Sequence, residues 1–115
     1  MCHALVIEDD FLIAEYISLL AKEAGATTTA TAATQHEAVC AARECRPAVI
    51  LADVRLEAGT GPLAVQTIID EAGDIPVIFI TGNPEECVPC APPGIILSKP
   101  VNGRLIKAAF EQVLA

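Results

Sequence analysis

Five short aliphatic runs alternate along this chain with longer segments of helical periodicity. The runs lie at residues 4–7, 27–31, 49–51, 77–80 and 95–97. Four of them are almost wholly apolar, as expected of strands buried on both faces, whereas the Thr-rich second run suits an edge strand. Strands that alternate with helices are joined by right-handed crossovers into a parallel sheet with helices on both faces. The alternation therefore predicts an α/β fold built on a five-stranded parallel sheet.

Helical periodicity covers four segments, and prolines prevent a regular helix in a fifth. The predicted helices lie at residues 11–24, 35–45, 62–72 and 102–114. Thr34 and Glu37 form a capping-box pattern before the second helix, Pro62 suits the first turn of the third, and Asn102 can cap the last. Residues 84–94 contain four prolines, which block a helix interior. The fourth helix that the alternation calls for is therefore expected to be short or irregular.

Length and composition fit one domain with an aliphatic core. The 115 residues suit a single domain, which we take to span residues 1–115. Hydrophobic residues make up 53% of the chain and aromatic residues 3%, so Ala, Val, Ile and Leu must form the core. A net charge of −8 disfavours nucleic-acid binding, because an acidic surface repels phosphates. No secretory leader and no run long enough to span a membrane is visible, so we expect a cytoplasmic protein without a disulfide framework.

Polar side chains follow four of the five predicted strands. The residues at these strand ends are Glu8-Asp9-Asp10, Asp53, Thr81-Gly82 and Ser98-Lys99-Pro100. The carboxyl ends of parallel strands meet at one edge of a sheet, where ligands bind. Acidic groups gathered there repel one another unless a cation lies among them, and oxygen ligands favour Mg²⁺ over Zn²⁺ or Cu²⁺. The sequence therefore predicts a magnesium site at this edge of the sheet.

The same edge carries the groups that phosphoryl transfer requires. Carboxylates form covalent aspartyl phosphates, and a metal offsets the repulsion between such a nucleophile and the phosphoryl donor. Asp53 is therefore the candidate nucleophile. The Lys99 ammonium and the Thr81 hydroxyl are suited to hold the remaining phosphoryl oxygens. Mg²⁺ commonly takes only one or two protein carboxylates and leaves room for those oxygens.

Four motifs, each at the end of an apolar run, stand in a fixed order along the chain. They are Val6-Ile7-Glu8-Asp9-Asp10, Ile50-Leu51-Ala52-Asp53-Val54-Arg55-Leu56, Phe79-Ile80-Thr81-Gly82 and Lys99-Pro100. Together they resemble the motifs of the receiver domain of bacterial two-component response regulators, and the resemblance covers essentially the whole chain. It implies a flavodoxin-like, doubly wound sheet with strand order 2-1-3-4-5. It also implies a single-domain response regulator that catalyses only its own phosphorylation and dephosphorylation.

The resemblance implies a ligand set for the metal, which would be Mg²⁺ or Mn²⁺. Asp9 and Asp53 would bind the metal directly, and Glu8 would bind it through water. The backbone carbonyl of Arg55 would complete the protein ligands.

The resemblance also assigns the phosphoryl chemistry. Asp53 would accept the phosphoryl group from a sensor histidine kinase. Thr81 would bond the phosphoryl group and signal its arrival, and Lys99 would pair with it. Pro100 resembles the cis-proline that often follows this Lys.

Two further positions are expected to tune the lifetime of the phosphorylated state. In such domains the residues two places after the phosphoacceptor and two places after the switch Thr border the path of the hydrolytic water. Arg55 and Asn83 occupy these positions, and Gly82 lies between Thr81 and Asn83. We therefore expect Arg55→Ala and Asn83→Ala to change the dephosphorylation rate.

One position departs from the family pattern. Ile96 stands three residues before Lys99, where many receivers carry a Tyr or Phe whose ring turns inward when the Thr moves. The usual coupling of Thr81 to an aromatic ring is therefore not expected. Residues 79–83 are similar to the Phe-Ala-Thr-Gly-Tyr motif of a subgroup that has a degenerate fourth helix and often works with HWE-type histidine kinases. This similarity suggests switching by ordering of residues 82–94.

Other functions are open to this sequence. A pseudo-receiver would use the same fold as a protein-binding module without phosphorylation. A metal-dependent phosphatase needs a second Asp two residues after its nucleophile, where Arg55 stands, and a flavin-binding domain needs a phosphate-binding loop after the first strand. With no output domain in the sequence, we expect signalling through an unidentified downstream protein or a phosphotransfer protein.

The remaining reactive side chains favour no separate site. Cys87 and Cys90 match a C-x-x-C pattern, but prolines surround them and no second ligand pair with zinc-site spacing accompanies them. We therefore expect no metal or redox role for this pair.

Overall fold

The computed structural model describes residues 3–56, 58–82, 95–100 and 102–114. The segment predicted to contain a short or irregular fourth helix, and with it Asn83, Cys87 and Cys90, lies outside these residues. The described part of the chain alternates strands with helices as expected.

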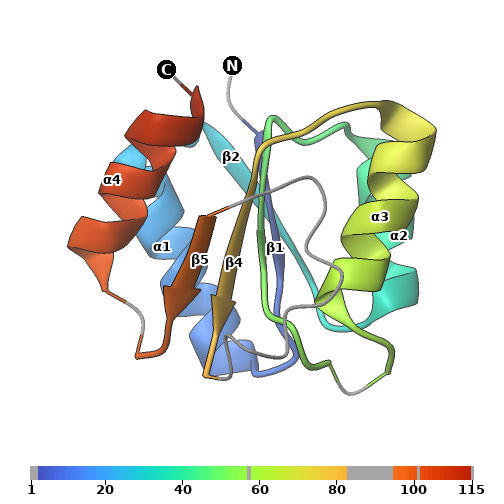
Figure 1. Ribbon diagram of the computed structural model, residues 1–115, viewed down its shortest axis with the longest axis horizontal. Coiled ribbons are helices and arrows are strands. Elements are labelled where there is room, and N and C mark those ends of the chain that lie inside the picture. The colour runs from blue at the N-terminus through green and yellow to red at the C-terminus, as the bar shows by residue number, and fades with distance from the viewer. Residues whose placement is uncertain (1–2, 57, 83–94, 101, 115) are drawn as a thin grey trace.

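The sheet has five parallel strands in the order β2-β1-β3-β4-β5, which confirms the predicted order (Figure 1). The strands are β1 (His3–Ile7), β2 (Thr28–Ala32), β3 (Val49–Ala52), β4 (Val77–Thr81) and β5 (Ile95–Ser98). Every residue of β3 and β4 is buried, whereas only Ala32 is buried in the Thr-rich β2. The less apolar run therefore lies at the sheet edge, where one side of a strand meets solvent.

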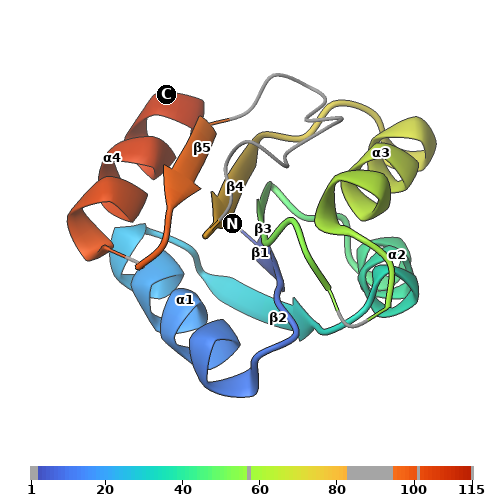
Figure 2. The same ribbon diagram turned by 60° about the horizontal axis from the view of Figure 1, so that its bottom comes forward.

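Four helices cover the sheet in the described part of the chain. They are α1 (Phe11–Ala24), α2 (Gln35–Glu44), α3 (Gly61–Ala72) and α4 (Gly103–Leu114). Helices α1 and α4 lie side by side on one face of the sheet, and α2 and α3 lie on the other (Figure 2). This two-sided cover explains why the central strands are unbroken apolar runs.

Side-chain caps set where two of these helices begin. The Thr34 hydroxyl accepts a hydrogen bond from the Glu37 backbone N–H at 3.1 Å, and the Glu37 carboxylate accepts one from the Ala33 N–H at 3.2 Å. The return bond thus falls one residue earlier than in a standard capping box. The Thr60 hydroxyl caps α3, so that helix begins at Gly61, one residue before the predicted start.

The core forms two aliphatic layers, one on each face of the sheet. Leu5 and Ile7 of β1 pack in the layer under α2 and α3, and the alternate residues Ala4 and Val6 pack in the layer under α1 and α4. Burying one such Leu, Ile or Val side chain contributes about 1.5–3 kcal/mol. The two layers therefore hold the central strands, and with them the strand ends, in a fixed register.

Among the described residues, no helix combines the length and the apolar character needed to cross a membrane.

Candidate functional site

The strand ends β1, β3, β4 and β5 meet at one edge of the sheet, the lower edge in Figure 1. The ladder of hydrogen bonds continues one residue past three of these ends, at Glu8, Asp53 and Lys99. The Asp53 N–H donates to the Ile7 carbonyl at 2.8 Å, and the Lys99 N–H donates to the Thr81 carbonyl at 2.9 Å. The backbones that carry Asp53 and Lys99 are therefore fixed by the sheet and not by a free loop.

Lys99 joins two carboxylates at this edge. Its ammonium donates to Glu8 Oε1 at 2.9 Å and to Asp53 Oδ2 at 3.1 Å. The side chain of Glu8 is 1% exposed, that of Asp53 10% and that of Lys99 23%. Ionised groups this far from water are stable only when paired and hydrogen-bonded, so these three side chains depend on one another.

The second oxygen of each of these two carboxylates accepts a hydrogen bond from a backbone N–H. Asp53 Oδ1 accepts from the Val54 N–H at 2.8 Å, and Glu8 Oε2 accepts from the Asp10 N–H at 3.2 Å. The Asp10 side chain caps α1 by accepting from two N–H groups of its first turn. Asp10 therefore serves the helix, while Glu8 and Asp53 are held in fixed orientations toward Lys99.

Burial and pairing shift two pKa values in this cluster. Burial raises the pKa of the Glu8 carboxyl above its ordinary value, and outweighs the lowering effect of its hydrogen bonds with Lys99 and Asp10. Burial of the Lys99 ammonium acts to lower its pKa, but its hydrogen bonds to Glu8 and Asp53 and the charges of both carboxylates raise it overall. Lys99 thus stays charged while the most buried carboxyl of the cluster gives up its proton less readily.

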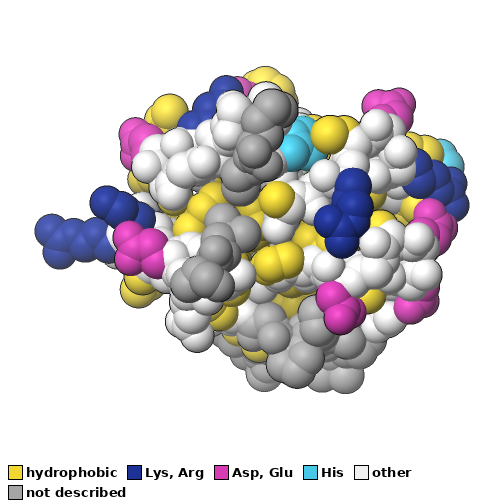
Figure 3. All heavy atoms as spheres, turned by 90° about the horizontal axis from the view of Figure 1, so that it is seen from above, with side chains coloured by type: hydrophobic (Ala, Val, Ile, Leu, Met, Phe, Trp, Pro, Cys, Tyr) yellow, Lys and Arg dark blue, Asp and Glu magenta, His cyan; other side chains and the backbone are white. Residues whose placement is uncertain are grey.

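Three carboxylates lie close enough to share one cation. Glu8, Asp9 and Asp53 each offer an oxygen, and these oxygens lie within 4.8 Å of one another. Asp9 is exposed, whereas the other two are buried or nearly so. An all-oxygen set of this kind suits a hard divalent cation such as Mg²⁺. Figure 3 views the opposite edge, where the strands begin, and there the acidic side chains are scattered among other types.

The predicted switch residues lie beside this cluster. Thr81 is 1% exposed at the end of β4, and its neighbour in the sheet register is Ser98, the residue before Lys99. The Lys99–Pro100 peptide bond is cis, as the resemblance implied. The geometry brings Thr81 and Lys99 to the same edge as Asp53.

The predicted modulating positions are placed differently. Arg55 is exposed and lies opposite Thr60 in an isolated antiparallel bridge. Ile96 is 42% exposed and stands in register with Phe79, and Gly82 is exposed at the end of β4. Asn83 lies outside the described residues. The expectations about the phosphorylated lifetime thus stay predictions.

Two features of the site were not anticipated from the sequence. The direct bond between Glu8 and Lys99 joins residues 91 positions apart, and no local pattern signals it. Gly61 is the second, since a side chain there would collide with the backbone carbonyl oxygen of Asp53. Its only sequence signal is a glycine before Pro62 at the start of the helix that follows Asp53.

Comparisons with known proteins agree with this geometry. Residues 4–111 match the model of the response regulator receiver domain. Over 113 residues the chain is 34% identical to the phyllosphere-induced regulator PhyR of Methylorubrum extorquens. The matched segment covers 96% of this chain and 42% of that protein. The chain thus spans less than half the length of this curated relative.

Solved structures give the same picture. The receiver domain of the response regulator PhyR from Erythrobacter litoralis, solved by NMR, is 32% identical with a TM-score of 0.87, over 98% of this chain and 89% of that one. The crystal structure of the anti-anti-sigma factor PhyR from Bartonella quintana is 34% identical with a TM-score of 0.83, over 99% of this chain and 48% of that one.

Proposed function

Because the chain belongs to the response regulator receiver domain family, we propose that its Asp53 accepts a phosphoryl group from a sensor histidine kinase in the presence of Mg²⁺. In this proposal residues 1–115 form one receiver domain that works in the cytoplasm. It is a signalling protein and not an enzyme beyond its own phosphorylation and dephosphorylation.

The observation that carries the proposal is the contact of the Lys99 ammonium with Asp53 Oδ2 at 3.1 Å, inside a nearly buried cluster. A carboxylate nucleophile needs an opposite charge nearby to receive a phosphoryl group, because both reactants are anionic. Lys99 lies where it can pair with a phosphoryl oxygen once that group is attached to Asp53. The buried Thr81 hydroxyl lies at the neighbouring strand end and is suited to donate to another oxygen.

The residues present fit the metal that the family implies. Opposite ligands of an octahedral Mg²⁺ lie about 4.2 Å apart, because each bond is about 2.1 Å long. The three carboxylate oxygens lie within 4.8 Å of one another, which is close to that span. Asp9 and Asp53 would bind the metal directly, Glu8 through water, and the Arg55 carbonyl would complete the set. When bound, the metal would offset the charge repulsion between Asp53 and the incoming phosphoryl group.

The transfer itself exchanges one bond to phosphorus for another. A carboxylate oxygen of Asp53 attacks the phosphorus of the phosphohistidine, the P–N bond breaks, and the imidazole of the kinase leaves and takes up a proton. Lys99 pairs with the phosphoryl oxygens as their charge moves onto this chain. The Val54 N–H holds one oxygen of Asp53, which keeps the carboxylate oriented during the transfer.

Output through another protein completes the proposal. A 34% identical relative from Bartonella quintana is called an anti-anti-sigma factor, which names a protein that acts through protein contacts. We propose that this chain likewise signals by binding a downstream protein, or passes its phosphoryl group to a phosphotransfer protein.

Intact-mass measurement after incubation with acetyl phosphate tests this function. The wild type should gain the mass of one phosphoryl group with Mg²⁺ and not with EDTA. Asp53→Ala should gain nothing, and Asp74→Ala, which removes an exposed carboxylate two residues past the end of α3, should behave as the wild type does. No gain in the wild type, despite Mg²⁺ binding, would favour a phosphorylation-independent protein-binding module.

A further inference from the structure

The chain turns back on itself directly after Asp53. Arg55 and Thr60 face each other in an antiparallel bridge, and the Gly61 N–H donates to the Val54 carbonyl at 3.0 Å. The described residues from Val54 to Gly61 therefore leave the site and return to it, and Gly61 packs directly against the Asp53 backbone. We call the described residues between Val54 and Gly61 the Asp53 turn. This turn carries the backbone carbonyl of Arg55.

Gln35, the first residue of α2, holds the far end of the Asp53 turn at two points. Its backbone N–H donates to the Ala58 carbonyl at 3.0 Å, and its side-chain Oε1 accepts from the Thr60 N–H at 3.3 Å. Thr60 is the residue that lies opposite Arg55 in the bridge. The Gln35 side chain thus bonds to Thr60, and Thr60 lies opposite Arg55. The backbone carbonyl of Arg55 is the group that would bind the metal.

The Asp53 turn approaches Gln35 closely at Gly59. Gly59 has a φ of +86°, and a Cβ built there would lie 2.5 Å from the Gln35 Cβ. Only glycine accepts both that conformation and that approach. The Asp53 turn therefore lies against this side chain without space between them.

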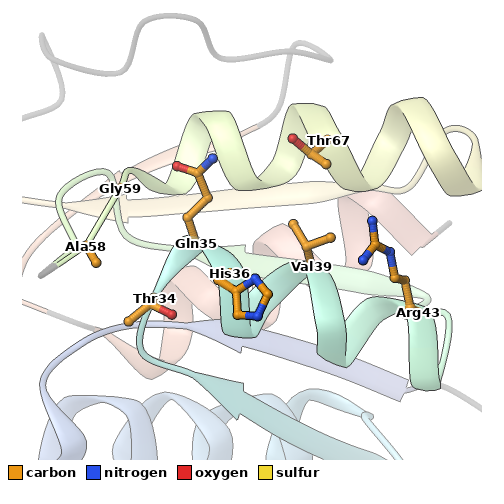
Figure 4. Close-up of a pocket in the computed structure, with 8 residues that line it drawn as sticks. All are labelled: Thr34, Gln35, His36, Val39, Arg43, Ala58, Gly59 and Thr67. Atoms are coloured by element: carbon orange, nitrogen blue, oxygen red, sulfur yellow. The ribbon is translucent and has the colours of Figure 1, made fainter.

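Gln35 also borders a groove that opens between α2 and α3 (Figure 4). In that view Gln35 and Val39 rise from α2 toward α3, and Thr67 lies on α3 facing them. None of the eight residues that line the groove is a predicted site residue. The two hydrogen bonds of Gln35 described above go to Ala58 and Thr60, so its effect on the site passes through the Asp53 turn.

We propose that Gln35 is a positioning residue for the metal site: by fixing Thr60, it holds the Arg55 carbonyl where a cation bound by Asp9 and Asp53 meets it. The inference rests on the proposed function, because it assigns Arg55 the ligand role given there. A ligand that is already in place costs little ordering entropy when the cation binds, whereas a mobile turn must be ordered at that moment. Removing the Gln35 side chain should weaken metal binding and leave the bound geometry unchanged.

A Mg²⁺ titration followed by the backbone amide signals of Asp53 and Arg55 tests the proposal. Gln35→Leu removes the acceptor and nearly keeps the size, and Gln35→Glu restores an acceptor oxygen. Gln66 offers a matched control, because it makes one side-chain hydrogen bond, to Asp70 at 2.9 Å, on the neighbouring helix. The same two changes at Gln66 control for lost polarity and for added charge.

Gln35→Leu should weaken Mg²⁺ binding by roughly three- to tenfold, the equivalent of one hydrogen bond. Gln35→Glu should return the affinity to within about twofold of the wild type, and both Gln66 variants should match it. The rate of phosphorylation by acetyl phosphate at saturating Mg²⁺ should be unchanged in Gln35→Leu, because the chemistry does not involve this residue. Should Gln35→Leu not fold, Gln35→Asn shortens the side chain and removes the same contact.

The outcomes separate this inference from the function on which it rests. Wild-type Mg²⁺ affinity in Gln35→Leu, or an equal loss in Gln66→Leu, overturns the positioning role. A wild type that binds Mg²⁺ but is not phosphorylated overturns the phosphoryl-accepting function alone, since the titration needs no phosphoryl group. A wild type that does not bind Mg²⁺ overturns both.

Discussion

Two regions of this molecule each contain ion pairs, and the lengths of these pairs are nearly equal. At the carboxyl edge of the sheet, the Lys99 ammonium lies 2.9 Å from Glu8 and 3.1 Å from Asp53. Between α2 and α3, the Arg43 guanidinium donates two hydrogen bonds to Glu71, both at 2.8 Å. By distance and bidentate geometry alone, the ion pair between α2 and α3 would be the stronger of the two.

Burial reverses that order. The side chains of Arg43 and Glu71 are 60% and 40% exposed, whereas that of Glu8 is 1% exposed. Hydrogen bonding to Glu71 raises the pKa of Arg43, and the same bonds lower the pKa of Glu71, but water and salt screen an exposed pair. At the sheet edge the Glu8 side chain is only 1% exposed, so little water reaches it to replace a lost partner. The energy of an ion pair therefore depends on what solvates each charge when its partner is removed.

The largest effect is expected from Lys99→Met in metal-free buffer. This change leaves Glu8 and Asp53 buried together without a counter-charge, and removing one partner of a buried pair costs about 3–5 kcal/mol. We expect a value near the lower end, about 3 kcal/mol, because Glu8 can take up a proton and reduce the repulsion. Urea unfolding of both proteins at neutral pH with EDTA measures it. A loss close to zero would mean that the cluster is solvated.

Mg²⁺ is expected to stabilise the wild type by a comparable amount. A ligand that binds only the folded state at 100 times its Kd adds about 2.7 kcal/mol to the free energy of unfolding. Because the cation supplies positive charge to the same carboxylates, it should also recover part of the stability lost in Lys99→Met. Thermal unfolding over a range of Mg²⁺ concentrations measures both effects, with Asp53→Asn as the variant that should lose most of the response. An equal rise in Tm in Asp53→Asn would indicate metal binding elsewhere.

A smaller effect is expected on the pH dependence of stability without metal. Burial raises the pKa of Glu8 above its ordinary 4.5, so the folded state binds the proton more tightly than the unfolded state. The stability that Glu8 contributes is therefore complete below pH 4.5 and is lost as the pH rises through the raised value. The stability that the raised pKa of Lys99 contributes is complete below its ordinary 10.5, so it stays constant over this pH range and is lost only at higher pH.

Comparison with Glu8→Gln isolates this contribution. The free energy of unfolding of the wild type, minus that of Glu8→Gln, should fall as the pH rises from 4.5, in EDTA. Measuring both proteins at each pH cancels the effects of the acids that do not interact with Glu8, including Glu71, whose lowered pKa acts in the opposite direction. A difference that rises with pH would show that pairing with Lys99 outweighs burial at Glu8.

The sequence predicted the fold well because the strands carry a strong local signal. Three of the four apolar runs are buried on both faces, and the Thr-rich run lies at one edge of the sheet. The expectation was wrong for the fourth run, because β5 forms the other edge and leaves Ile96 exposed. The edge at which the candidate site residues gather was also predictable, because every strand of a parallel sheet ends at the same edge. A residue such as Lys99 needs only its place after β5 to be assigned to that edge.

The pairings inside the site were less predictable, since they depend on side-chain reach across the fold. The resemblance implied a water-mediated metal contact for Glu8, and the structure adds a direct bond to Lys99. The contact of Gln35 with Thr60 joins positions 25 residues apart at a helix start and a turn, and neither residue type signals it. Local patterns predict which edge a group reaches, and packing decides what it meets there.

The smallest effect is expected from Arg43→Met, which breaks the exposed bridge between α2 and α3. Glu71 is then solvated by water, and the methionine keeps most of the aliphatic part of the side chain between α2 and α3. We expect a change in Tm near the error of the measurement in 0.15 M salt, and no change in the Mg²⁺ affinity of the site. Repeating the melts at low salt should enlarge the difference, because screening is then weaker. If Arg43→Met instead destabilises the protein as much as Lys99→Met does, burial does not determine how much each ion pair contributes to stability. The bidentate geometry of Arg43 with Glu71 would then determine the contribution of the pair between α2 and α3.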